Sequence, residues 1–142
     1  MLGTWTCRYT TIWPGRGPGR IDTNVNAMVL DGQYMMTTTT SKPFDKMRTK
    51  TLVNQSWLTY NRKDRLWYWF EISNFGGFET ATSPGWNGNE FVLTDTYSSE
   101  VGRAGVTTIT KVSPGELSIA FVVPAKPTIA TREVCTKSPS GT

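Results

Sequence analysis

Carboxylates are the first side chains to consider for chemistry, because the sequence contains eleven of them and no histidine. Without histidine, a Ser-His-Asp triad, a Cys-His pair and a histidine metal site are excluded. Many of the carboxylates fall in or beside predicted turns, where they usually cap or solvate the backbone. Glu71 differs because it follows the aromatic run Trp67 to Phe70. Burial against aromatic rings raises the pKa of a carboxyl group, so Glu71 is the one candidate acid or base. The simpler interpretation is a Glu71 that faces outward or pairs with Arg.

Two cysteines, Cys7 and Cys135, lie near opposite ends of the chain. If the first and last strands pair, the two thiols come within bridging distance. A disulfide would place the protein in an oxidising compartment, the periplasm or the outside of the cell. The alternative is two buried free thiols in a cytoplasmic protein. Two cysteines cannot complete a thiolate zinc site, and we expect no metal and no cofactor.

A glycine- and arginine-rich run, Gly-Arg-Gly-Pro-Gly-Arg, occupies residues 15–20. Exposed amides and two guanidinium groups suit phosphate, but the run lacks Gly-Lys-Ser/Thr, and Pro18 removes one donor. We therefore interpret it as a loop over one end of the fold, with an anion site as the alternative.

The elements that must position these side chains are short strands separated by turns. Aromatic residues make up 12% of the chain, and thirteen Gly and eight Pro interrupt it. The strand spacing of about 8–12 residues is typical of a sandwich or barrel. We expect an all-β fold, a single closed antiparallel β-barrel of about 8–10 strands over residues 1–137, with a frayed tail at 138–142. The predicted strands are Thr4–Thr11, Ile21–Leu30, Gln33–Ser41, Thr49–Tyr60, Leu66–Ser73, Phe78–Thr82, Phe91–Tyr97, Gly105–Val112, Glu116–Val123 and Thr128–Lys137.

Aromatic side chains are the main signal for a ligand site. Consecutive residues of a strand point to opposite faces, so the run at 67–70 supplies both faces of the sheet. We predict a ligand-binding lining of Trp57, Tyr68, Phe70 and Phe78, with Tyr34 and Phe91 as further members. The opposite parity would exchange Tyr68 and Phe70 for Trp67, Trp69 and Glu71.

The opening Gly3-Thr4-Trp5 resembles the Gly-x-Trp that begins the first strand of lipocalins and related calycin barrels. The Asp31-Gly32 hairpin signal, the Tyr60-Asn61 turn and the downstream Trp69 are similar to a bacterial lipocalin-like domain family of unknown function. That family usually has Asp where this chain has Asn61. The resemblance implies a barrel fold but indicates no particular activity.

The resemblance also implies how the barrel is closed. In these families the Trp closes one end and an Arg from the last strand packs across it, which assigns Gly3, Trp5 and Arg132 to barrel closure here. However, Arg132 and Cys135 have opposite strand parity, whereas Trp5 and Cys7 share theirs. Either a bulge near Arg132 reconciles the two pairings, or one of them fails.

The predicted function is a non-catalytic, lipocalin-like barrel that binds a small, largely apolar ligand in its lumen. One alternative is a barrel enzyme of cyclase or isomerase type that uses Glu71. Another is a self-assembling interaction module that uses the second aromatic face. The net charge of +4 is spread along the chain, so we expect no nucleic-acid partner. No apolar run of about 18 residues occurs, so we expect no membrane span, and Met1 is followed directly by a predicted strand rather than a signal peptide.

Overall fold

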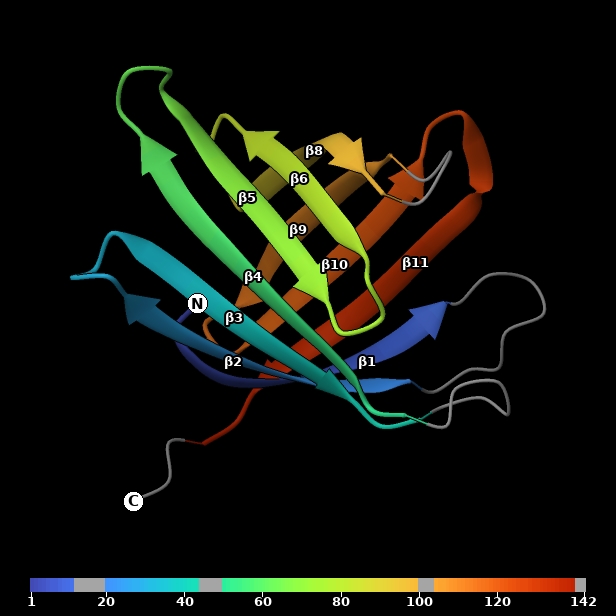
Figure 1. The fold of residues 1–142 in the computed structure, drawn as a ribbon. Helices are drawn as coiled ribbons and strands as arrows, with labels where there is room; N and C mark the ends of the chain where they lie inside the picture. The colour runs from blue at the N-terminus through green and yellow to red at the C-terminus, as the bar shows by residue number, and fades with distance from the viewer. Residues whose placement is uncertain (12–19, 44–49, 100–103, 140–142) are drawn as a thin grey trace.

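The computed structural model describes residues 1–11, 20–43, 50–99 and 104–139, and these form one closed antiparallel β-barrel (Figure 1). No helix occurs in these ranges, and therefore none that could cross a membrane. The strands are β1 Gly3–Thr11, β2 Ile21–Val29, β3 Tyr34–Ser41, β4 Leu52–Asn61, β5 Leu66–Ser73, β6 Phe78–Ser83, β7 Trp86–Asn87, β8 Glu90–Ser98, β9 Val106–Ser113, β10 Glu116–Val123 and β11 Lys126–Lys137.

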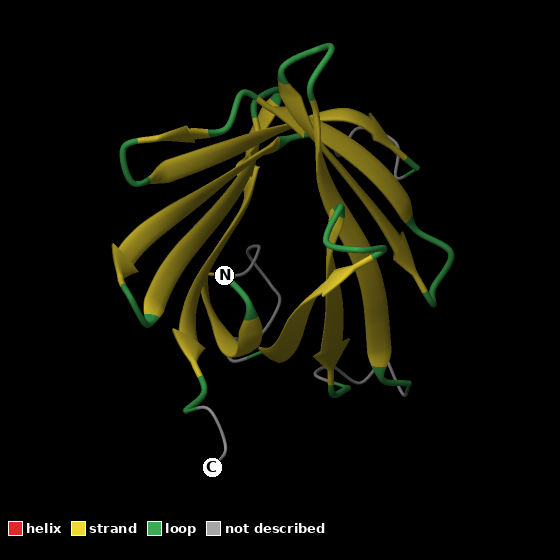
Figure 2. Cartoon of the chain, turned by 90° about the vertical axis from the view of Figure 1, so that its left-hand side faces the viewer, coloured by secondary structure: helices red, strands yellow, loops and turns green. Residues whose placement is uncertain are grey.

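Ten of these strands form the barrel wall, and the predicted fold class is confirmed. Strands β1 to β6 pair in sequence, as do β8 to β11; β11 returns to β1, and β6 closes the ring on β8. The two-residue β7 pairs with β8 alone. Figure 2 shows the strands curving round into this wall. Because the ring is closed, each of the ten strands is hydrogen-bonded to a neighbour on both sides, and none of them is left as an edge strand.

The two ends of the barrel differ in their connections. One end, called here the hairpin end, carries the turns β2–β3, β4–β5 and β9–β10. Asp31 and Gly32 have φ of 54° and 79°, the positive values of a type I′ turn, which confirms the predicted Asp31-Gly32 hairpin. The opposite end, called here the loop end, is where β1, β3 and β8 finish. The predicted loop and anion site at 15–20 lie outside the described residues, apart from Arg20.

Side chains alternate between the inside and the outside of the barrel along each strand. On β5, Trp69 and Glu71 face the interior, whereas Tyr68 and Phe70 face outward. Eight of the ten buried apolar residues described form two clusters inside the barrel, Trp5–Cys7–Leu117–Cys135 and Leu58–Ala81–Phe91–Leu93; Leu52 and Val123 lie outside both. The two clusters therefore lie toward the hairpin end and along β1, β10 and β11.

A disulfide fastens the barrel where its first and last strands meet. Cys7 and Cys135 are direct partners in the β1–β11 register and are bonded to each other across a sequence separation of 128. The two strands lie side by side in Figure 1, in blue and red. The predicted pairing of the terminal strands and of the two cysteines is confirmed.

The prediction that Arg132 packs on Trp5 is wrong. Arg132 is exposed and lies opposite Thr11 at the loop end, beyond a register shift between Tyr9 and Thr11. The partner of Trp5 in the register is Lys137, whose Nζ stands 5.9 Å from the centre of the Trp5 ring. Strand parity explains the result, because Lys137 shares the inward parity of Cys135 and Arg132 does not. A lysine thus takes the position that the resemblance assigned to an arginine.

Candidate functional site

The barrel encloses a cavity of about 460 Å³ that is lined by residues from β1 to β6 and from β8 to β11. This volume lies within the range of small-molecule sites. Of the lining residues at the loop end, Phe75, between β5 and β6, is 49% exposed and Phe78, the first residue of β6, is 40% exposed, whereas Trp5 at the hairpin end is 4% exposed. Among the described residues, the cavity therefore opens toward the loop end.

Toward the hairpin end, β2 contributes Asn24 and Asn26 to the cavity, but the wall formed by β5 and β8 is apolar. Trp69, Phe91 and Leu93 line that wall, and Phe91 is 1% exposed. The Phe91 ring meets Trp67 edge-on, with 6.0 Å between ring centroids, and tilts against Trp86 at 5.3 Å. These contacts give the cavity a rigid apolar floor.

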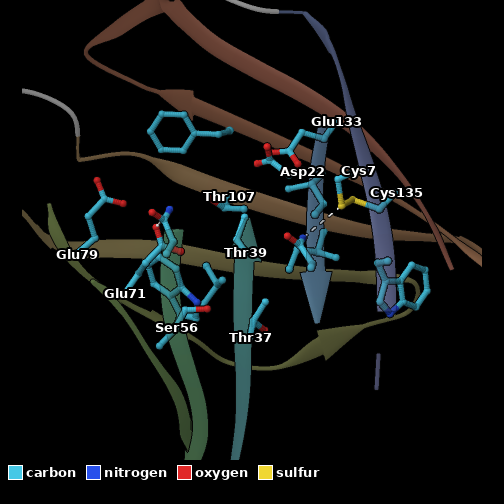
Figure 3. Close-up of a pocket in the computed structure, with 18 of the residues that line it drawn as sticks. Cys7, Asp22, Thr37, Thr39, Ser56, Glu71, Glu79, Thr107, Glu133 and Cys135 are labelled. Atoms are coloured by element: carbon cyan, nitrogen blue, oxygen red, sulfur yellow. Dashed lines mark hydrogen bonds between the residues drawn. A yellow bond between two sulfur atoms is a disulfide. The ribbon is translucent and has the colours of Figure 1, made fainter. Parts of the chain in front are cut away.

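The half nearer the loop end carries five carboxyl groups. Figure 3 shows Asp22 and Glu133 close together on one wall, and Glu71 and Glu79 close together on another. Glu71 and Glu79 are direct cross-strand partners on β5 and β6. Asp95 on β8 is the fifth. Buried carboxylates are normally paired with cations. The partners and pKa values of these five groups therefore have to explain how they share one cavity.

Asp22 is the carboxylate that has a full set of partners. Arg20 donates to both of its oxygens, from Nε and Nη2 at 2.7 Å each, and the hydroxyl of Ser41 also donates to it. The Arg20 guanidinium stacks over the Tyr9 ring at 4.7 Å. Arg20 thus neutralises Asp22 directly, and its charge also acts on Glu71 and Glu133, where it partly offsets the rise in pKa that burial causes.

Glu71 faces the cavity with one amide donor. Asn54 donates from Nδ2 to Glu71 Oε1 at 2.7 Å, and Glu79 accepts instead from the Ser98 hydroxyl at 3.0 Å. Burial, and next the negative charge of Glu79, raise the pKa of Glu71 to about 8. At neutral pH the Glu71 side chain is therefore mostly protonated.

Two further carboxyl groups of the cavity have raised pKa values. Burial raises the pKa of Glu133 to about 7, against a hydrogen bond with Tyr9 that lowers it. Burial also raises the pKa of Asp95 to about 6, although the Gly105 amide donates to it at 2.8 Å. Three carboxyl groups of one cavity thus hold protons far above the usual carboxyl range.

Three asparagine oxygens at the cavity have no hydrogen-bond partner among the described residues. They are the buried Oδ1 atoms of Asn24, Asn26 and Asn54, all from lining residues. Their amide nitrogens are already engaged, with Cys7 Sγ, the Met1 carbonyl and Glu71 respectively. Asn54 thus presents a spare acceptor in the loop-end half, beside Glu71, and Asn24 and Asn26 present theirs farther toward the hairpin end, opposite Trp5 and Gly3.

The structure divides the predicted lining residues between two faces. Phe78 and Phe91 line the cavity. Trp57, Tyr68, Phe70 and Tyr34 do not, so the preferred strand parity was wrong. Of the alternative set, Trp69 and Glu71 line the cavity, and Trp67 packs against the cluster that contains Phe91. Trp57 and Phe70 instead stack on each other on the outer face, 4.7 Å between centroids, and Tyr34, Tyr68 and Phe70 line an outer depression.

Sequence reasoning missed most of the polar half. Asp22, Glu79, Asp95 and Glu133 were assigned to no site, and neither were Asn24 and Asn54. A usable signal was present in β2, where the alternate residues Asp22, Asn24 and Asn26 are all polar. A polar side of a strand usually faces solvent, whereas in this barrel it faces the cavity.

One cluster brings together atom types that often ligate metals, but its sulfurs are in a form that does not bind a metal. The sulfurs of Cys7 and Cys135 and a Glu133 oxygen lie within 4.8 Å of one another. Because both sulfurs are in the disulfide, neither is a thiolate that could ligate a metal.

Comparison with known proteins assigns this chain to no family. No protein-family model matches the chain, and no curated protein matches it either. What defines the molecule is thus its class, a ten-stranded closed antiparallel β-barrel with an internal cavity and a disulfide between its terminal strands.

Proposed function

We propose that this protein is a non-catalytic, lipocalin-like barrel that binds a small, largely apolar molecule in its lumen. The observation that carries the proposal is the cavity of about 460 Å³, which the inward side chains leave unfilled. The apolar floor around Trp69, Phe91 and Leu93 supplies binding through burial, at about 25 cal/mol per Å² before ordering costs. The Gly3-x-Trp5 start supports the lipocalin likeness.

Blocking the lumen tests this proposal. Dansyl probes, whose emission changes in apolar surroundings, are titrated against the wild type, Thr107→Trp and Thr108→Trp. Thr107 lines the cavity, and its neighbour Thr108 on β9 does not, so the two variants place the same ring on opposite faces of one strand. We expect Thr107→Trp to abolish binding and Thr108→Trp to preserve it, with equal far-UV spectra. Equal binding by both variants would show that the probe sits elsewhere.

A second candidate function is an enzyme of cyclase or isomerase type that uses Glu71 as its acid or base. The specific observation is a cavity-facing carboxyl group with a pKa of about 8, which can both donate and accept a proton near neutral pH. Exchange of deuterium from solvent into a panel of small ketones, followed by NMR, tests it. Exchange that Glu71→Gln removes supports catalysis, and exchange that survives in Glu71→Gln excludes this residue.

We also propose an oxidising location for the protein, in the periplasm or outside the cell. The supporting observation is the Cys7–Cys135 disulfide. Alkylation of free thiols before cell lysis, followed by mass measurement, tests the proposal, because a bridged protein takes up no label. Two labels per chain would place it in a reducing compartment.

A further inference from the structure

The carboxyl groups of the cavity outnumber its cations. Among the described side chains that line it, five are carboxylic acids and one, Arg20, is cationic. Asp22 already accepts two charge-assisted hydrogen bonds from that guanidinium. Glu71, Glu79, Asp95 and Glu133 therefore give the loop-end half of the cavity an excess of negative charge whenever they ionise.

The cavity also has more unpaired hydrogen-bond acceptors than donors among the described residues, so its hydrogen bonding favours the same kind of ligand as its charge. Beside Glu71, the buried Oδ1 of Asn54 accepts no hydrogen bond, and the nitrogen of that amide is used; the Oδ1 of Asn24, nearer the hairpin end, is a second unpaired acceptor. A buried acceptor without a donor costs free energy, which a ligand that brings N–H groups would recover. An anionic or carbonyl group would add another acceptor instead.

Aromatic rings stand at the same end. Phe75 and Phe78 are lining residues at the loop end, and Phe78 directly precedes Glu79. Cations are attracted to the faces of such rings. Charge, hydrogen bonding and ring faces therefore agree on the kind of group that this half of the cavity would hold.

We propose that the molecule bound in the lumen carries a cationic, hydrogen-bond-donating group, such as a primary amine or an amidine, which sits among Glu71, Glu79 and Glu133 while its apolar body rests on the Phe91 floor. This inference rests on the proposed lumen-binding function and narrows it to one ligand class. The bound cation replaces the protons that the carboxyl groups hold in the empty cavity. The charged groups that act on Glu71 are Glu79 from β6, Arg20 before β2 and Glu133 from β11.

Three fluorophores with one dansyl body and different charges test the inference. Dansylcadaverine is cationic, dansyl amide is neutral and dansylglycine is anionic. We expect dansylcadaverine to bind at least about tenfold more tightly than dansyl amide, and dansylglycine to bind most weakly. Raising the pH from 6 to 8.5 should strengthen dansylcadaverine binding by about tenfold and leave dansyl amide unchanged.

Matched variants locate the effect. Glu71→Gln and Glu133→Gln should each weaken dansylcadaverine about fivefold or more without weakening dansyl amide. Glu90→Gln, an exposed residue of β8 outside the cavity lining, is the control and should change neither. Two carboxyl positions are tested, so one variant that fails to fold leaves the other decisive.

The outcomes separate the two proposals. Equal binding of all three probes, or tighter binding of dansylglycine, overturns the cationic ligand while lumen binding stands. Cation preference that persists unchanged in both variants overturns it as well. Failure of every probe to bind overturns lumen binding and the ligand class together.

Discussion

The hairpin-end half of the cavity and the loop-end half are built from the same strands but do opposite things. On β5, Trp69 joins the apolar floor while Glu71, two residues later, joins the carboxyl groups. On β8, Phe91 and Leu93 are buried in the core, while Asp95 belongs to the acidic half. Packing at the hairpin end stabilises the fold, whereas buried carboxyl groups at the loop end cost stability. The comparison indicates that the acidic half exists for something other than folding.

The largest expected effect comes from the apolar half. Phe91→Ala removes a ring that packs against Trp67 and Trp86 and leaves a void beside the cavity. We expect a loss of about 4 kcal/mol in the free energy of unfolding, measured by urea denaturation. Val92→Ala, on the outer parity of the same strand, is the control and should cost about 1 kcal/mol or less. Similar losses for both would break the division between floor and surface.

The next effect concerns Glu71 and depends on pH. Because its pKa is raised to about 8 in the folded protein, the unfolded chain loses the Glu71 proton first as the pH rises from 4.5. The unfolded state then binds fewer protons than the native state, so stability falls between about pH 4.5 and 8. Glu71→Gln removes this fall and should be more stable than the wild type by about 3 kcal/mol at pH 8.5, with no gain at pH 4.

Urea denaturation at the two pH values measures this difference. Glu90→Gln is again the control, since Glu90 is exposed. A Glu71→Gln variant that is less stable than the wild type at pH 8.5 would show that the carboxyl group is a structural partner. The acidic half would then stabilise the fold as the apolar half does, and the difference between the two halves would disappear.

The smallest effect lies at the closure of the hairpin end. Lys137→Gln removes the cation that stands 5.9 Å from the centre of the Trp5 ring. We expect a loss of about 0.5 kcal/mol in the thermal stability of the folded protein, obtained from the shift in melting temperature. Arg132→Gln should change nothing at this site, because Arg132 lies five residues from Lys137 along β11, on the outer parity and opposite Thr11. A larger loss from Arg132→Gln would restore the pairing that the family resemblance implied.

The sequence predicted the strands and their closure well, because both leave local signals. The Asp31-Gly32 turn appears at its expected place, and the pairing of Cys7 with Cys135 followed from their positions near the two chain ends. Strand bounds differ by a few residues, as for β4, which begins at Leu52 instead of residue 49.

The orientation of the strands could not be predicted, for a physical reason. Alternation identifies two faces but not which one is inside, and hydrophobicity settles that only when the interior is apolar. In β2 the outer residues Ile21 and Val25 are 42% and 46% exposed, whereas Asp22 is buried. In β5 both faces carry aromatic side chains, so hydrophobicity does not distinguish the inner face from the outer one. The carboxyl cluster escaped notice for the same reason, because its members come from five strands and meet only after closure.

The disulfide has a consequence for the connectivity of the whole molecule. Because Cys7 and Cys135 are bonded, the chain between them is a covalent ring, and every connection between strands of the barrel lies within it. A single cut by a protease anywhere in that ring yields two segments that remain one molecule. Release of a fragment requires a second cut or a reductant, so nicked barrels keep their full mass until the sulfur–sulfur bond is opened.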